Sequence, residues 1–195
     1  MRKREGNKEK DILDAAVKVF AENGYHRSKV TSIAEAAGVA TGSIYLYYPN
    51  KESILLRIFE RLWTDYTQTL QETVKRLDYD PTQKLDLVID HLFDMFVANP
   101  ALAVVFVNEQ QYLINNKKGN IGKHYDNFLD LAEEIIHEGV KKKIFNPDVD
   151  VKLYRHFITG GIRSVLFYWA QSTPSISLDR VRMNVKLFLR NGLLL

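Results

Sequence analysis

The sequence predicts an all-α protein of about nine helices. Apolar residues recur at intervals of three or four along most of the chain, and no β-like alternation of useful length interrupts this spacing. Clusters of Gly, Pro and Asn divide the periodic stretches into segments of ordinary helix length. Because hydrophobic residues make up 46% of the 195 residues, we expect a sizeable core.

The composition excludes several classes of protein. The absence of cysteine rules out a disulfide framework and thiolate metal sites, and it suits a reducing cytosol. No apolar run approaches the roughly 18 residues that indicate a membrane span. The opening MRKREGNKEK leads into an amphipathic helix and lacks the apolar core of a signal peptide. We therefore expect a cytoplasmic protein with no membrane partner.

The net charge of +3 is confined to one part of the chain. Residues 1–51 hold nine Lys and Arg against six Asp and Glu, whereas residues 52–195 hold eighteen of each sign. Five of the basic residues crowd at the start: Arg2, Lys3, Arg4, Lys8 and Lys10. Attraction to DNA phosphates would favour such an arm, and a simple solvated terminus is the alternative.

The first predicted helix begins after Asn7, which can cap it. Its apolar stripe consists of Ile12, Leu13, Ala16, Val17 and Phe20. Asn23-Gly24 ends the helix, and Tyr25 is expected to pack back onto its last turn. This helix would form the floor of a three-helix domain.

A tight helical corner follows between Ser28 and Tyr48. Ser28 can cap a short helix that ends at Gly38, a position suited to positive φ. Thr41 can then cap a second helix over Gly42 to Tyr48, of about two turns. Ala34 and Gly38 allow close approach, while Ile33, Val39 and Ile44 fill the corner. This pattern predicts a helix-turn-helix, whose second helix enters the DNA major groove; a helical corner that never meets DNA is the alternative.

The stretch ILDAAVKVFAENGYHRSKVTSIAEAAGVATGSIYLYYPNKESIL resembles the N-terminal pattern of the TetR family of bacterial transcriptional regulators. The resemblance is specific over residues 8–60, and the layout beyond them is compatible with it. It implies a helix-turn-helix DNA-binding domain at residues 1–51 and a helical effector-binding and dimerisation domain at residues 52–195. Within the family, the chain looks most like the repressors of fatty-acid degradation that respond to long-chain acyl-CoA.

The second helix of the corner lacks Arg, Asn and Gln, the side chains that read bases through paired hydrogen bonds. The resemblance places Thr41, Gly42 and Ser43 near base edges, and Tyr45, Tyr47 and Lys51 against phosphates. Lys29 and Thr31 are expected on the same surface, whereas Tyr48 should pack inside. Base reading would then rest on hydroxyls, thymine methyls and DNA shape, with Arg27 or Lys29 as candidates for a guanine contact.

One long helix is predicted from Asn50 to about Leu77, roughly 40 Å at 1.5 Å per residue. It reads as a strut between the two domains, and Tyr79-Asp80-Pro81 breaks it. Further breaks are expected at Asn99-Pro100, Gly119–Gly122, Asn146-Pro147 and Ser172–Ser175, with the last two helices near residues 149–171 and 177–192.

These last two helices carry more apolar surface than a small bundle requires. Small residues lie one turn apart beside aromatic residues, and a second apolar stripe lies on the final helix; the predicted dimerisation residues are Phe157, Gly160, Gly161, Ser164, Tyr168, Val181, Val185 and Phe188. Pairing with the same helices of a second subunit would form a four-helix interface, and packing within one chain is the alternative. A two-fold dimer also suits a palindromic DNA site.

Aromatic residues are numerous in the second domain. The predicted ligand-binding residues combine aromatic and polar side chains: Phe93, Phe96, Phe106, Asn108, Tyr112, Phe128, Arg163 and Phe167. The residues alone favour an aromatic core, whereas the family resemblance implies an effector pocket. Arg155, Arg163 and Lys123 are the candidate partners for the phosphates of a CoA moiety.

The sequence offers no support for catalysis or a metal site. The five histidines show no metal-binding spacing, and no phosphate-binding or nucleophile motif occurs. We expect neither a cofactor nor enzymatic activity. The interpretation is a dimeric regulator, a repressor as in most of the family, that binds a palindromic operator and is released by an apolar effector. A dimer that binds DNA without a ligand switch and an enzyme that uses the aromatic cavity are the alternatives.

Overall fold

The structure is a computed structural model that describes residues 8–171 and 176–194. Within these ranges it contains nine α-helices and one isolated β-bridge, between Phe145 and Leu194, so the all-α prediction is confirmed. The helices are α1 (Lys8–Asn23), α2 (Val30–Ala37), α3 (Thr41–Tyr45), α4 (Lys51–Val74), α5 (Pro81–Ala98), α6 (Pro100–Asn115), α7 (Ile121–Lys141), α8 (Val151–Gln171) and α9 (Leu178–Leu193). Asn7, Arg2, Lys3, Arg4 and Ser172–Ser175 lie outside the described residues.

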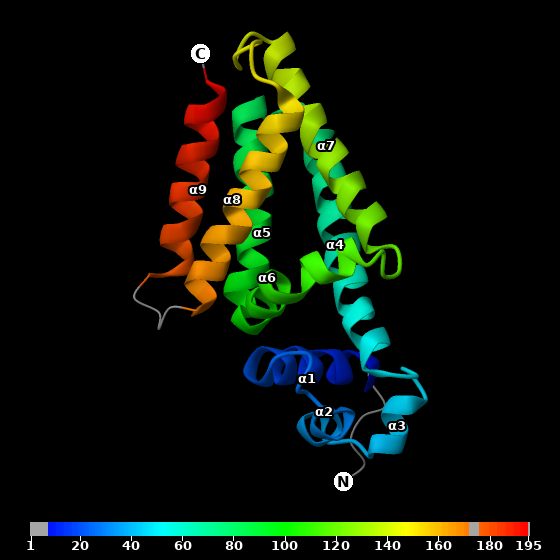
Figure 1. Cartoon of the computed structure of the whole chain (residues 1–195). Coiled ribbons are helices and arrows are strands. Elements are labelled where there is room, and N and C mark those ends of the chain that lie inside the picture. Colours follow the sequence, from blue (N-terminus) through cyan, green and yellow to red (C-terminus); the bar gives the residue numbers. More distant parts are fainter. Residues whose placement is uncertain (1–7, 172–175, 195) are drawn as a thin grey trace.

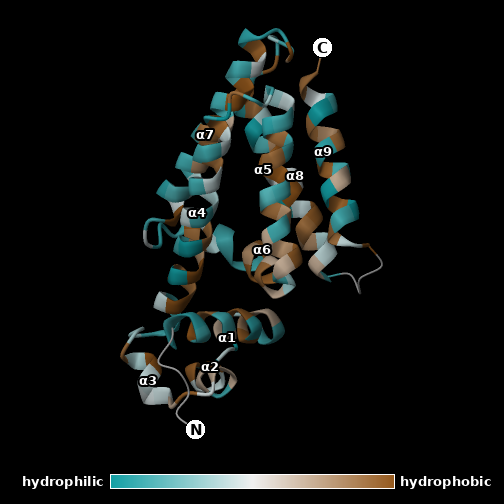
Figure 2. Cartoon of the chain, turned by 180° about the vertical axis from the view of Figure 1, so that it is seen from behind, coloured by the Kyte–Doolittle hydropathy of each residue, from teal (hydrophilic) through white to brown (hydrophobic). Residues whose placement is uncertain are grey.

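The first three helices form a small head at one end of the molecule, and α4 leads from this head into a larger helical body (Figure 1). In the body α4 packs against α7 and α5, while α9 packs against α5. Helix α6 lies at the end of the body nearest the head and contacts α1. In Figure 2 the hydropathy colour alternates along α7 and α9, whereas the first part of α6 is apolar on the visible side.

The loop between α1 and α2 differs from the expectation at one residue. Ser28 does not cap α2, because its hydroxyl instead donates to the carbonyls of Val19 at 3.1 Å and Gly24 at 2.7 Å. Val19 lies in the last turns of α1 and Gly24 directly follows the helix, so the Ser28 side chain connects the loop to the end of α1 and is not available to cap α2. The left-handed cap at Gly38 is confirmed, with φ 66° and ψ 34°.

Helix α3 is shorter than predicted. It begins at Thr41, so Thr41 is a helical residue, and the preceding Ala40 makes no side-chain cap bond. The helix ends at Tyr45, although the amides of Tyr47 and Tyr48 still bond to the Ile44 carbonyl, each at 2.9 Å. Pro49 disfavours a helical conformation for the residue before it, so the second expected turn does not form.

The predicted cap of α4 is confirmed. Asn50 accepts from the Ser53 amide at 2.9 Å, and the Ser53 hydroxyl oxygen accepts from the Asn50 amide at 3.3 Å. Asp80 and Gln83 form the same reciprocal pair at the start of α5, after the predicted break. The end of α4 lies at Val74 and not at Leu77, which is exposed, so the expectation for this residue is corrected.

An ion pair between Lys84 and Glu138 lies at the C-terminal end of α4. The Lys84 ammonium donates to the last helical carbonyl, that of Val74, at 2.9 Å and to Glu138 at 2.7 Å. Glu138 also accepts from Lys142 at 2.7 Å. The pair joins α4, α5 and α7, and it satisfies a carbonyl that has no partner inside its own helix.

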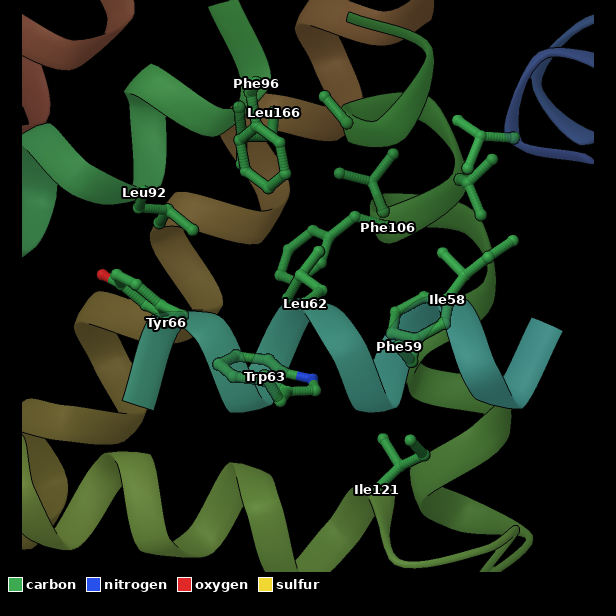
Figure 3. Close-up of a cluster of buried hydrophobic side chains, with 14 of the residues drawn as sticks. Ile58, Phe59, Leu62, Trp63, Tyr66, Leu92, Phe96, Phe106, Ile121 and Leu166 are labelled. Carbon is green, nitrogen blue, oxygen red and sulfur yellow. The ribbon is translucent and has the colours of Figure 1, made fainter. Parts of the chain in front are cut away.

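The core of the body surrounds one face of α4. Figure 3 shows Phe59, Trp63 and Tyr66 following one another along this helix, with Leu92 and Phe106 supplied by α5 and α6. The rings of Trp63 and Phe106 lie 6.1 Å apart, and the Tyr66 hydroxyl donates to the Val88 carbonyl at 2.7 Å. The strut that leads from the head therefore forms one wall of the body's interior.

Gly139 in α7 is required by close packing. A Cβ at this position would overlap the ring of Phe145, which is buried and follows in the loop after the helix. We expect Gly139→Ala to lower the free energy of unfolding by about 1–3 kcal/mol, even though alanine favours helix formation. Urea denaturation should show this, with Gly122→Ala as the control because a Cβ there meets nothing within 4 Å. An unchanged midpoint for Gly139→Ala would contradict the packing described.

No single helix of the described part of the chain is long and apolar enough to cross a membrane; α5 and α6 satisfy the length and composition test only as a pair, which is bent by 111°.

Candidate DNA interface and effector cavity

The predicted DNA-contacting surface of the head is available to solvent. Tyr45 is 53% exposed and Tyr47 46%, Gly42 is exposed, and Thr41 and Ser43 are half-buried. Lys29 and Thr31 at the start of α2 are also exposed. Ile44 has no exposed surface and anchors α3 in the corner. The structure thus presents the hydroxyl-rich side of α3 outward.

Tyr48 belongs to the core of the head, as predicted. Its ring is buried and its hydroxyl donates to Glu9 of α1 at 3.1 Å. Burial, followed by the nearby Glu9 carboxylate, raises the pKa of Tyr48 well above its usual value. The hydroxyl therefore stays protonated and fixes the end of the corner to α1.

Lys51 does not extend toward solvent as a phosphate contact would require. Its ammonium donates to the carbonyls of Tyr25 at 2.7 Å, His26 at 3.0 Å and Ser28 at 3.1 Å, and it lies 4.5 Å from the centre of the Tyr25 ring. Three carbonyls of the loop between α1 and α2 thus use the donors of this side chain. In this structure the Lys51 ammonium has a structural role within the head; a phosphate contact at Lys51, in which its backbone N–H at the start of α4 would assist, stays a prediction.

The two lysines of this region should therefore respond differently to substitution. Lys51→Met keeps the aliphatic stem but leaves three carbonyls without their donor, so we expect it to lower the free energy of unfolding by about 1–3 kcal/mol. Lys29→Met should leave the stability unchanged and reduce the salt dependence of DNA binding by about two units of slope, one for each subunit of the expected dimer. Chemical denaturation and DNA titrations at several salt concentrations separate the two roles. If Lys51→Met reduced the salt dependence of DNA binding and left the stability unchanged, the Lys51 ammonium would be a phosphate contact.

The body encloses a cavity of about 340 Å³ among α4 to α9. Its walls are mostly aliphatic and aromatic, with polar groups from α6 and α8. Three of the predicted ligand-binding residues line it, Phe106, Phe128 and Arg163. Arg155 lines it too, but its guanidinium pairs with Glu133 at 2.5 Å and Asp130 at 3.5 Å. Lys123 is not part of the wall.

The other five predicted ligand-binding residues lie away from the cavity wall. Phe93 and Phe96 have no exposed surface and pack in the core, which is the alternative that the residues alone favoured. Asn108 and Phe167 are exposed. Tyr112 faces the head, where its ring lies 6.1 Å from that of His26. The expectation is corrected for all five, because a helical pattern separates buried from exposed positions but does not show which buried positions border a cavity.

Two wall residues that the sequence analysis did not assign to a ligand carry polar atoms without a hydrogen-bond partner in the described structure. These atoms are Nε1 of Trp63 and Oε1 of Gln110. In the sequence Trp63 is one of many apolar residues on α4, and Gln110 is one of two adjacent glutamines. No pattern of residue types distinguishes either position.

The junction between head and body is formed by α6 and the loop that follows it. The rings of Tyr25, His26 and Tyr112 contact one another in sequence, and Lys118 pairs with Glu52 at 2.8 Å. Burial raises the pKa of Tyr25 to about 12. Helix α6 therefore touches the head with one side, while Phe106, Gln110, Gln111 and Ile114 of the same helix line the cavity.

The outer face of α8 and α9 is apolar and exposed. Among the predicted dimerisation residues Phe157 is 77% exposed and Phe188 62%; Gly160, Gly161, Ser164 and Tyr168 are also exposed. Val181 and Val185 are buried inside their own chain, so their assignment to the interface is corrected. Leu153, Met183 and Leu187 add exposed apolar surface to α8 and α9.

Comparison with known proteins agrees with this architecture. Residues 12–58 match the family model for bacterial regulatory proteins of the tetR family, and residues 59–192 match that for the C-terminal region of YsiA-like proteins. The fatty acid metabolism regulator protein of Bacillus subtilis is 33% identical, over 93% of this chain and 93% of its own length. The transcriptional repressor KstR2 of Rhodococcus jostii is 26% identical, over 94% and 89%.

Two solved structures are close to the whole fold. The fatty acid degradation regulator FadR from Bacillus halodurans superimposes with a TM-score of 0.85 at 32% identity, covering 97% of this chain and 98% of the other. FadR from Bacillus subtilis, solved in complex with stearoyl-CoA, gives a TM-score of 0.81 at 32% identity, with coverage of 94% and 98%.

The helix-turn-helix head and the helical body with its cavity define a ligand-responsive type of transcriptional regulator. This chain belongs to the TetR family. The predicted family resemblance and DNA-binding regulatory function are thereby confirmed, and the relatives named above are transcriptional regulators.

Proposed function

We propose that the chain is a dimeric repressor that binds a palindromic operator through α3 and is released when a long-chain acyl-CoA enters the body. The observation that carries the proposal is that α6 borders the cavity on one side and the DNA-binding head on the other. A ligand that displaces α6 would change the position of α1, which packs against α6. The position of α3 on the DNA would change with it. The complex of the related Bacillus subtilis FadR with stearoyl-CoA supports the choice of ligand class.

The chemistry of the cavity suits an acyl chain. Aromatic side chains from three helices, among them Trp63, Phe106 and Phe128, supply apolar wall, and transfer of each CH₂ group from water contributes about 0.8 kcal/mol. The charged part of a CoA would remain outside. Arg163, which is exposed at the wall, is the cation that we assign to it.

The DNA side of the proposal rests on the exposed surface of α3. Tyr45 and Tyr47 would contact phosphates, while Thr41, Gly42 and Ser43 lie toward the bases. A second copy of the chain, paired through the apolar face of α8 and α9, would bind the second half-site of the operator. In this proposal the chain acts through binding alone and has no enzymatic activity, and its site of action is the cytoplasm.

The test begins with selection of an operator from random duplexes by the full-length protein. Stearoyl-CoA should then weaken operator binding by about 5- to 150-fold, the usual range of allosteric coupling. CoA alone and stearate serve as controls for the two halves of the ligand. Operator affinity that is unchanged at saturating stearoyl-CoA would overturn the proposed ligand, and failure to select any duplex would overturn the DNA-binding role.

A further inference from the structure

Three residues of the cavity wall carry a buried polar atom without a hydrogen-bond partner among the described residues: Trp63, Gln110 and Arg155. The Arg155 guanidinium is already paired with Glu133 through another of its nitrogens, whereas the indole of Trp63 has no other polar atom. Trp63 is 2% exposed and Gln110 is 4% exposed, and both line the cavity. Within the described residues neither the indole Nε1 nor the amide Oε1 has a hydrogen-bond partner. More than nine in ten buried polar groups in proteins are paired, so such atoms require an explanation.

The two groups belong to the same part of the cavity. The Trp63 ring lies 6.1 Å from the ring of Phe106, and Gln110 follows Phe106 by one helical turn on α6 (Figure 3 for Trp63 and Phe106). Residues four positions apart on a helix share one face, which places Gln110 beside the ring that Trp63 contacts. Trp63 and Gln110 are therefore both neighbours of Phe106 in the cavity wall.

Several polar groups of the surrounding wall already have hydrogen-bond partners. The hydroxyl of Tyr66 donates to Val88, that of Tyr154 donates to Leu189 at 2.7 Å, and Gln111 donates to Asn115 at 2.8 Å. None of these three wall residues needs a polar ligand atom. Apart from Nε of Arg155, the unpartnered atoms of the wall are one donor, the indole N–H, and one acceptor, the amide oxygen.

We propose that Trp63 and Gln110 form a polar subsite that receives a hydroxyl group carried by the acyl chain of the effector. A hydroxyl accepts a hydrogen bond from the indole N–H and donates one to the amide oxygen, so a single group satisfies both. A carbonyl satisfies only the indole. An unsubstituted chain satisfies neither and leaves both groups buried and unpaired, which is costly. The inference rests on the proposed function, because it specifies which acyl chains the same cavity prefers.

The experiment compares stearoyl-CoA with derivatives that carry one hydroxyl near the thioester, at mid-chain or near the methyl end. Binding to the full-length protein is measured by calorimetry. At one of the three positions we expect the hydroxyl to improve affinity by about tenfold, the effect of one or two neutral hydrogen bonds. The keto derivative at the same position should gain less, because it cannot donate.

Two conservative variants locate the effect. Trp63→Phe removes the indole N–H and keeps an aromatic ring, and Gln110→Leu removes the amide and keeps the length of the side chain. Each should abolish the advantage of the hydroxyl, measured as the ratio of the affinities for the hydroxylated ligand and for stearoyl-CoA in the same variant, so that a change shared by both ligands cancels. Thermal melts verify that both variants fold. The comparison of hydroxylated and unsubstituted ligands in the unmodified protein does not depend on these variants.

Several outcomes would overturn the subsite. They are weaker binding of all three hydroxylated ligands than of stearoyl-CoA, an equal gain from the keto derivative, or an advantage that survives both substitutions. A crystal structure of the stearoyl-CoA complex in which one water bridges Trp63 and Gln110 would also overturn it. Failure of stearoyl-CoA itself to bind would instead contradict the proposed function, so the two failures are distinguishable.

Discussion

Replacing Phe157 and Phe188 by glutamate should convert the protein to a monomer and weaken operator binding by about 100-fold or more. Both rings are mostly exposed on the apolar face of α8 and α9, and burial of a carboxylate against the same face of a second copy is costly. A monomer loses the second half-site, whose binding is otherwise intramolecular. Analytical ultracentrifugation and operator titrations measure the two effects.

The control for this prediction is Leu77→Glu, which adds one of the two charges at an exposed apolar residue outside α8 and α9. It should leave both the mass and the operator affinity unchanged. A double variant that stays dimeric would show that another surface holds the dimer. A monomer that retains full operator affinity would show that operator binding does not require a two-fold symmetric dimer.

A large side chain that fills the cavity should leave DNA binding intact and prevent the ligand from releasing the protein from DNA. Ala132 lines the cavity from α7, and Ala132→Trp places an indole in the space that the acyl chain would take. We expect stearoyl-CoA binding to weaken by about 10- to 100-fold, because overpacking of this kind costs about 1–3 kcal/mol. Operator affinity without ligand should stay within about twofold, giving a repressor that is not released.

The matched control is Ala98→Trp, at an exposed position near the end of α5 that does not line the cavity. This variant should respond to stearoyl-CoA like the unmodified protein. If Ala132→Trp were still released at the same ligand concentration, the acyl chain would have to bind elsewhere.

Much of the head could be predicted because its residues have few alternatives. The left-handed conformation at Gly38 suits glycine, Asn50 and Ser53 form a local cap, and Ile44 is the apolar residue that α3 turns inward. Each of these features depends on neighbours in the sequence. The predicted end of α3 differs from the observed one because Tyr45, Leu46, Tyr47 and Tyr48 fit a helical turn, whereas Pro49 disfavours a helical conformation for the residue before it.

The positions at which the structure differs from the expectation depend on contacts between distant segments. Lys51 turns toward three carbonyls of the loop between α1 and α2, and no sequence pattern indicates where carbonyls point. Helix α9 is apolar on two sides, so the sequence could not show that Val181 faces its own chain while Phe188 faces outward. The same limit applies to Phe96, which is core, and Phe106, which borders the cavity.

The switch itself is tested most directly by measuring stearoyl-CoA affinity in the absence and presence of saturating operator DNA. Thermodynamic linkage requires the operator to weaken stearoyl-CoA binding by the same factor by which stearoyl-CoA weakens operator binding. We predict equal factors, within the range of about 5- to 150-fold. Stearoyl-CoA affinity that is identical with and without operator would contradict a connection between the cavity and the DNA-binding head.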